Sequence, residues 1–178
     1  MMRKAIYIVT GVMAAGKSSI AEALAGRLDK SVHLRGDVFR RMIVNGRVDM
    51  SENPSEAALS QLEMRHDITA KAAIDYYNNG FTVIVQDNFL GDKLNYFSDL
   101  LDPCPTYIIV LNPSVSAIEQ RERIRQKKGY VGFAVADLHK SFLEETPRIG
   151  LWIDTTEMTI EQVVNEVEKR INNEGLIR

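Results

Sequence analysis

Apolar segments rich in isoleucine, valine and tyrosine alternate with segments of helical periodicity along the whole chain. The apolar segments are short and mostly lack a regular polar alternation, which is typical of parallel strands that are buried on both faces. An alternation of strands and helices predicts a parallel sheet covered by helices on both faces. The predicted strands are Ala5–Thr10, Val32–Arg35, Phe81–Gln86, Thr106–Leu111 and Leu151–Asp154.

Polar residues and glycines mark several ends of the predicted helices. Ser55 can cap a long central helix, Gly80 can end it, and Thr159 with Gln162 has the spacing of a capping box. Asn45–Pro54 is predicted to be a loop rather than a domain linker, so we expect a single domain over residues 1–178. The predicted helices are Lys17–Leu28, Val38–Val44, Ser55–Asn79, Lys93–Leu101, Val115–Lys127, Val135–Glu145 and Ile160–Asn172.

Composition and charge narrow the range of partners. A chain of 178 residues is long enough for one domain with its own core. The net charge of −2 provides no global attraction to nucleic acid or to an anionic membrane, so we expect neither as a partner. The only cysteine, Cys104, excludes an internal disulfide. No apolar run has the length of a signal peptide or a membrane span, so we expect a cytoplasmic protein. No sequence feature predicts an oligomeric state.

The first predicted strand leads into a glycine-rich turn. Gly11, Gly16, Lys17 and Ser18 match the spacing G-x-x-x-x-G-K-S, and the residues that follow are predicted to be helical. In this setting the backbone N–H groups point at phosphate oxygens, and the helix adds its positive end. Lys17 is expected to contact the β- and γ-phosphates of ATP, and the Ser18 hydroxyl to bind Mg²⁺. The predicted nucleotide-binding residues are Gly11, Val12, Met13, Ala14, Ala15, Gly16, Lys17, Ser18 and Ser19.

Two aspartates follow other predicted strands. In an open α/β sheet, ligands bind outside the carboxyl ends of the strands. Asp37 follows the second strand, where it could accept the proton of an attacking hydroxyl or merely cap the next helix. Asp87 ends the third strand as a Walker B aspartate does. There it could hold Mg²⁺, directly or through water, or form a turn with Asn88.

The densest positive charge of the chain lies in residues 121–128, after the fourth predicted strand. Arg121 and Arg125 are four residues apart and share one face of a helix. This face could clamp the transferred phosphoryl group, or it could be a solvated helix end that favours the helix dipole. We expect the first, with a mobile lid over residues 121–133 whose movement Gly129 and Gly132 would allow.

Four segments together resemble the small P-loop kinases of metabolites, most closely the chloramphenicol phosphotransferase-like group. They are Gly11–Ser19, Gly36-Asp37, Val83–Gly91 and Ile153–Thr156, and they keep their order over almost the whole chain. The resemblance implies a three-layer α/β/α P-loop NTPase fold. Its five-stranded parallel sheet would have the order 2-3-1-4-5, with Asp87 beside the P-loop. The resemblance also implies that Asp37 is the base that activates a substrate hydroxyl.

The segment 44–79, where such kinases hold their acceptor, differs from that of chloramphenicol kinase, so the acceptor stays open. We expect an ATP-dependent phosphotransferase that uses Mg²⁺ and transfers the γ-phosphate to a hydroxyl of a small molecule. The alternatives are an ATP-binding regulatory switch without an acceptor and a polynucleotide or nucleotide kinase. The expected acceptor face has mixed charge, which suits a small polar molecule. Its charged residues are Arg40, Arg41, Arg47, Asp49, Glu52 and Glu56.

Overall fold

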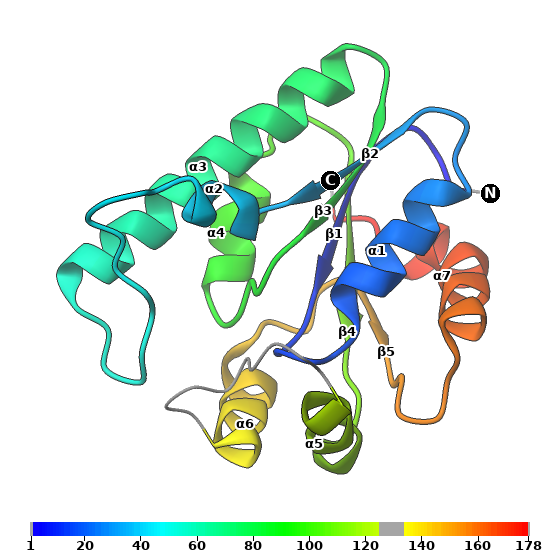
Figure 1. The fold of residues 1–178 in the computed structure, drawn as a ribbon. Helices are drawn as coiled ribbons and strands as arrows, with labels where there is room; N and C mark the ends of the chain where they lie inside the picture. The colour runs from blue at the N-terminus through cyan, green and yellow to red at the C-terminus, as the bar shows by residue number, and fades with distance from the viewer. Residues whose placement is uncertain (1, 125–133, 178) are drawn as a thin grey trace.

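The computed structural model describes residues 2–124 and 134–177. Its centre is a sheet of five parallel strands in the order β2-β3-β1-β4-β5 (Figure 1). The predicted fold class and strand order are therefore confirmed. The strands are β1 Ile6–Thr10, β2 Ser31–Arg35, β3 Thr82–Gln86, β4 Thr106–Leu111 and β5 Leu151–Ile153.

Helices cover both faces of the sheet. In Figure 1, α1 and α7 lie together on one face, α3 and α4 on the other, and α5 and α6 beyond the carboxyl ends of the strands. This arrangement leaves the carboxyl edge of the sheet enclosed by loops and helix ends. The helices are α1 Lys17–Gly26, α2 Asp37–Arg41, α3 Glu56–Asn78, α4 Lys93–Asp99, α5 Val115–Ile124, α6 Val135–Glu145 and α7 Ile160–Glu174.

The burial of the strands follows their position in the sheet. All residues of β1, β3 and β4 are buried, whereas those of β2, at the edge, are half-buried or exposed. The predicted caps are confirmed, because the Ser55 hydroxyl accepts from the backbone of Ala58 and a capping box opens α7. The helix predicted from Val38 to Val44 is wrong at its end: α2 ends at Arg41, and the chain turns through Gly46 at φ 78°.

Residues after α7 continue the sheet on the far side of β4. The short strand β5 pairs only with Ile109–Leu111. Beside the first half of β4, Gly175 accepts a backbone hydrogen bond from Ile108 (2.9 Å), and Ile177 donates one to Thr106 (3.0 Å). The bridge between Tyr107 and Leu176 is antiparallel. The segment 175–177 therefore pairs with the part of β4 that β5 leaves uncovered.

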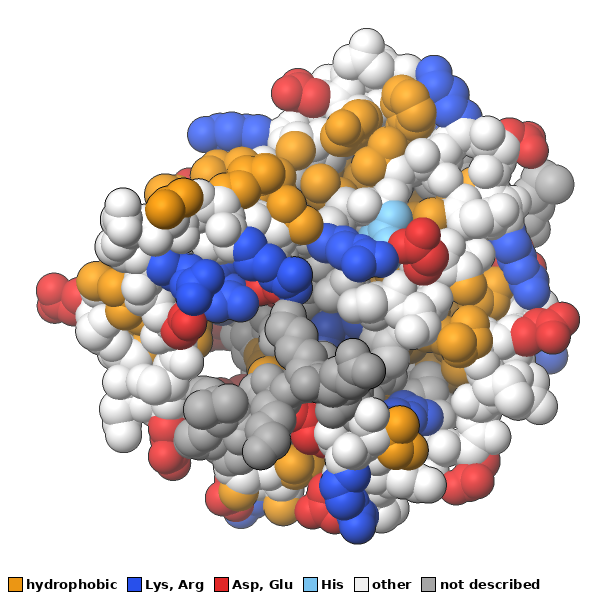
Figure 2. Space-filling model, in the orientation of Figure 1, with side chains coloured by type: hydrophobic (Ala, Val, Ile, Leu, Met, Phe, Trp, Pro, Cys, Tyr) orange, Lys and Arg blue, Asp and Glu red, His pale blue; other side chains and the backbone are white. Residues whose placement is uncertain are grey.

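Exposed apolar side chains gather around α2 and α3. Among the described residues, nine of the twelve large hydrophobic side chains that are exposed lie between residues 38 and 76. Figure 2 shows hydrophobic side chains along the surface that α3 forms, next to a group of Lys and Arg side chains. An apolar surface concentrated in one part of a protein commonly marks a binding surface. The nine residues are Val38, Met42, Val44, Val48, Met50, Leu59, Met64, Ile68 and Tyr76.

Candidate active site

The loop between β1 and α1 has the backbone geometry of a phosphate-binding turn. Gly11 and Gly16 have φ angles of 140° and 99°, in a region that side chains disfavour, and Ala14 also has a positive φ of 62°. A Cβ at Gly11 would lie 2.5 Å from the carbonyl oxygen of Leu111, so β4 leaves no room for a side chain there. Gly16 is the N-cap of α1, and the helix start therefore opens toward the loop.

Lys17, the first residue of α1, extends back over this loop. Its ammonium donates hydrogen bonds to the carbonyl oxygens of Gly11 (2.9 Å) and Val12 (2.7 Å), and the residue is only 7% exposed. A buried charge needs such partners because burial removes its hydration. The bonds hold a positive charge at the mouth of the loop, where phosphate oxygens would bind.

The carboxyl end of β3 lies beside the loop, because β3 pairs with β1. Here the Ser18 hydroxyl donates a hydrogen bond to the side-chain oxygen of Gln86 (3.1 Å). Gln86, the last residue of β3, was not among the predicted site residues. The signal that would have found it is its place one residue before Asp87, since successive residues of a strand point to opposite faces.

Asp87 is buried and faces α3. One carboxylate oxygen accepts from the backbone of Asn88 (2.8 Å), as in the predicted turn, and the other lies 3.2 Å from Nε of Arg65. Burial raises the pKa of Asp87, and the Arg65 charge opposes the rise. A Cβ at Gly36 would collide with this carboxylate, so Gly36, at the end of β2, allows Asp87 its position.

Asp37 begins α2 and holds two arginines. Its carboxylate accepts from Nε of Arg40 (2.8 Å) and from Nε of Arg41 (2.7 Å). Burial alone would raise the pKa of Asp37, but these guanidinium groups outweigh it and lower the pKa to about 2. Gly36, and not Asp37, is the N-cap of α2, and the cap makes no side-chain hydrogen bond. Asp37 is therefore ionised at neutral pH and lies at the carboxyl edge of the sheet.

Arg121 links α5 to the phosphate-binding loop. Its guanidinium donates to the backbone oxygen of Thr155 (2.6 Å) and, at 3.4 Å, to that of Ala15 in the loop. Thr155 follows β5, so Arg121 joins two segments that are far apart in sequence. Arg125 and the rest of the predicted lid, residues 125–133, lie outside the described residues. The lid therefore stays a prediction.

Arg65 on α3 was missed from the sequence. The apolar positions of α3 recur as Ala58, Leu62 and Thr69, and Arg65 falls on the same face at i+3 from Leu62. Its side chain is 12% exposed and lies against Asp87. A charged residue inside a buried helical stripe is the signal that would have found it, because such a charge needs a partner in the fold.

The side-chain oxygens of Ser18 and Asp87 are of the kind that Mg²⁺ prefers. Among the described residues, no cluster of three or more His, Cys, Asp or Glu side chains could hold a metal ion. Mg²⁺ bound with a nucleotide needs only one or two protein oxygens, because it keeps several waters. Ser18 supplies a hydroxyl, and the buried Asp87 oxygen that faces Arg65 has no hydrogen-bond donor in the described part of the chain.

The sheet order, the loop and its lysine define a fold of the P-loop kinase class. The chain belongs to the AAA_33 family, whose model is described as an AAA domain and matches residues 6–146. No curated protein sequence matches the chain significantly. No helix in residues 2–124 or 134–177 is long and apolar enough to cross a bilayer.

Solved structures agree on this fold. A tunicamycin resistance protein from Deinococcus radiodurans has a TM-score of 0.72 at 16% identity, over 99% of both chains. A gluconokinase from Sinorhizobium meliloti has a TM-score of 0.61 at 17% identity, over 96% of this chain and 95% of its own. A thymidylate kinase from Candida albicans has a TM-score of 0.62 at 18% identity, over 98% of both chains. Identities this low show the fold alone.

Proposed function

We propose that this protein is an ATP-dependent phosphotransferase that phosphorylates a hydroxyl of a small molecule. The observation that carries the proposal is the meeting of three groups at the carboxyl edge of the sheet. Asp87 follows β3, which pairs with the strand that leads into the loop of Lys17, and the glycine before Asp37 lies against the Asp87 carboxylate. A phosphate-binding cation and an ionised carboxylate that face one edge are what direct phosphoryl transfer requires.

Each group has a role in this proposal. The amides of residues 11–19 and the Lys17 ammonium bind the ATP phosphates, and Arg121 closes over them with Arg125. Ser18, oriented by Gln86, holds Mg²⁺ together with Asp87. When bound, Mg²⁺ neutralises phosphate charge. All of these groups belong to one proposed domain, residues 1–178, in a cytoplasmic protein.

Asp37 positions the acceptor and takes its proton. The acceptor oxygen forms a bond to the γ-phosphorus, the bond from that phosphorus to the bridging oxygen breaks, ADP leaves, and the hydroxyl proton passes to Asp37. With a pKa of about 2, Asp37 is ionised but weakly basic. The proton therefore moves late in the transfer, and the acceptor hydroxyl must share the carboxylate with Arg40 and Arg41.

Turnover by a lysine variant tests the proposal. ATP consumption and phosphorylated product are measured with a panel of alcohols, sugars, nucleosides and aminocyclitol antibiotics. Lys17→Ala should fold normally and lose roughly 10²- to 10³-fold in turnover, the usual cost of one donor that stabilises developing charge. The matched control is Lys71→Ala, an exposed lysine on α3 that should keep full activity.

Two other results would replace this proposal with an alternative. ATP hydrolysis that no panel compound increases would favour a regulatory switch. Phosphorylation of oligonucleotide ends, with binding that weakens steeply as salt rises, would favour a polynucleotide kinase. Unchanged ATP affinity and turnover in Lys17→Ala would show that the loop does not bind the ATP phosphates.

A further inference from the structure

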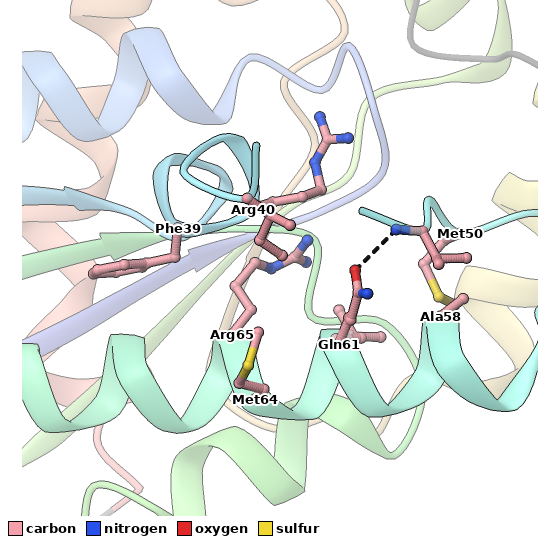
Figure 3. A pocket seen from close by; sticks show the side chains of 10 residues that line it. Phe39, Arg40, Met50, Ala58, Gln61, Met64 and Arg65 are labelled. Atoms are coloured by element: carbon pink, nitrogen blue, oxygen red, sulfur yellow. Dashed lines mark hydrogen bonds between the residues drawn. The ribbon is translucent and has the colours of Figure 1, made fainter. Parts of the chain in front are cut away.

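A pocket opens between α2, the loop that follows it, and α3. Figure 3 shows side chains of α3 directed toward Phe39 and Arg40, with Met50 of the loop beside them. Most of its wall is apolar. Phe39 and Ile43 come from α2 and the residues just after it, Val48 and Met50 from the loop, and Leu62 and Met64 from α3.

Two arginines of the wall connect this pocket to the proposed active site. Arg40 lines the pocket and donates to Asp37, the proposed base. Arg65 also lines it, and its Nε lies 3.2 Å from the Asp87 carboxylate. A molecule in the pocket would therefore have the polar edge of the active site at one end and apolar side chains around the rest.

The charged residues of this face are largely paired with one another. Arg40 forms an ion pair with Asp49 as well as with Asp37, and Arg47 lies 3.6 Å from Asp49. Within these ion pairs the positive and negative charges largely cancel. What they leave to a ligand is mainly the apolar wall, part of the exposed hydrophobic surface around α2 and α3 (Figure 2). The pocket therefore favours an acceptor that has an apolar body as well as a hydroxyl.

The pocket is narrow, and part of its wall is made of adaptable side chains. Its enclosed part measures only about 20 Å³, enough for one water molecule. Met50 and Met64 are 41% and 43% exposed, and methionine side chains adapt their shape readily. Gln61 ties the loop to α3, accepting from the backbone of Val48 and donating to the carbonyl oxygen of Gly46. These hydrogen bonds hold the loop on α3, and we expect the methionine side chains to be the part of the wall that adapts to a ligand.

We propose that the acceptor is an amphipathic alcohol, with an aryl or alkyl body seated in this pocket and its hydroxyl directed to Asp37. The proposal rests on the proposed phosphotransfer and names its substrate class. The compound should be small, because the enclosed part of the pocket holds only about one water molecule and a larger body needs the methionine side chains to move. The hydrophobic contact would supply binding energy, and Asp37 would select the hydroxyl end.

Methionine methyl signals test binding without any turnover. The protein is labelled at its seven methionine methyl groups and titrated with 3-phenylpropan-1-ol in one series and glycerol in another. Met50 and Met64 line the pocket, while the exposed Met42 does not, so Met42 is an internal control. Phenylpropanol should shift the first two signals and leave Met42 in place, and glycerol should shift none. Absent or uniform shifts would overturn the proposal, as would shifts caused by protein concentration alone, which would mean that a second copy covers the face.

A matched pair of variants tests the same pocket during turnover. Met64→Glu places a charge on the apolar wall, whereas Ile68→Glu places it one turn further along α3, outside the pocket, at similar exposure. Met64→Glu should raise the KM for aryl and alkyl alcohols at least about tenfold and leave the KM for ATP unchanged, while Ile68→Glu keeps both.

The outcomes separate this proposal from the proposed function. Phosphorylation of glycerol and sugars but not of aryl or alkyl alcohols would overturn the amphipathic acceptor and leave phosphotransfer intact. Specific Met50 and Met64 shifts, with no compound ever raising ATP turnover, would support the apolar site and overturn phosphotransfer. Equal KM values for aryl and alkyl alcohols in Met64→Glu and Ile68→Glu would show that the pocket does not bind the acceptor.

Discussion

At the scale of single residues, Asp37 has the most direct link between environment and chemistry. Two guanidinium groups hold its carboxylate, lower its pKa to about 2 and keep it charged under all physiological conditions. The same contacts stabilise the fold, because a carboxyl whose pKa is lowered below 3.8 stabilises the native state above that pH. This contribution, at most about 2 kcal/mol, is lost as the pH falls from about 4 to about 2.

Replacement of Asp37 by asparagine separates proton transfer from ATP binding. Asp37→Asn keeps the size of the side chain but cannot take a proton at neutral pH, so phosphoryl transfer should drop by about 10²- to 10⁴-fold. The affinity for ATP should stay within about twofold of wild type. Asp49→Asn is the control, since it also removes an ion pair with Arg40 but lies outside the proposed chemistry. Equal turnover in the two variants would show that Asp37 has no catalytic part.

Adding a side chain at Gly11 and removing one at Ala14 test the backbone geometry of the phosphate-binding loop. Gly11→Ala should destabilise the fold by about 2 kcal/mol or more, because its Cβ would lie 2.5 Å from the Leu111 oxygen at a strained φ. Ala14→Gly removes a side chain from a positive φ and should cost little or add up to about 1 kcal/mol. Denaturant unfolding of both variants measures the difference. The idea fails if Gly11→Ala unfolds at the wild-type midpoint.

At the scale of elements, the end of β3 shows where sequence reasoning stops. A buried apolar strand that leads to Asp87 was predicted correctly, and so was the place of this strand beside the loop. The sequence predicted that Asp87 holds Mg²⁺ together with Ser18. In the structure the Ser18 hydroxyl donates a hydrogen bond to Gln86. Neighbouring strand residues point to opposite faces, and periodicity cannot tell which face meets the loop when both faces are buried. Asp87 as a magnesium ligand therefore stays a prediction.

Helix α3 also carries a buried histidine, His66, next to Arg65. His66 is fully buried against Phe89, Phe97 and Tyr96, and neither ring nitrogen has a hydrogen-bond partner among the described residues. Burial lowers the pKa of His66 to about 4, helped by the nearby charges of Arg65 and Lys93. The histidine therefore behaves as an aromatic core residue that resists protonation.

His66→Phe should flatten the dependence of stability on pH. Between pH 6.5 and about 4, the unfolded chain binds a proton at His66 that the folded chain refuses, so the free energy of unfolding falls as the pH falls. The total loss is roughly 3 kcal/mol. His66→Phe should remove this part of the slope, with other groups titrating equally in both proteins. Urea unfolding at several pH values measures it, and parallel curves for variant and wild type would contradict the assignment.

At the scale of the whole molecule, the strand order was predictable and the pocket was not. The strand order came from the family resemblance that four ordered motifs carry, and the layered α/β fold came from the alternation of strands and helices. The pocket depends on how residues 39–50 fold back onto residues 58–65, a contact that no periodicity encodes. Charges counted along the sequence predicted a polar face, and the sequence gives no sign that some of them pair in space beside a pocket with a mainly apolar wall.

Removal of residues 175–178 tests how the sheet is completed. The truncated chain loses two backbone hydrogen bonds to β4 and the packing of Ile177 on the core, so stability should fall by about 2–4 kcal/mol. Removal of Arg178 alone is the control and should change little. The measurement is the midpoint of denaturant unfolding. A truncation that unfolds at the wild-type midpoint would show that these bonds are replaced by water at no cost.

The pairing of residues 175–177 with β4 also sets an order of events during synthesis. The segments of β1, β3 and β4 leave the ribosome well before these residues, which lie beside the first half of β4. The part of β4 that β5 leaves uncovered therefore stays without its neighbour until residues 175–177 have left the ribosome.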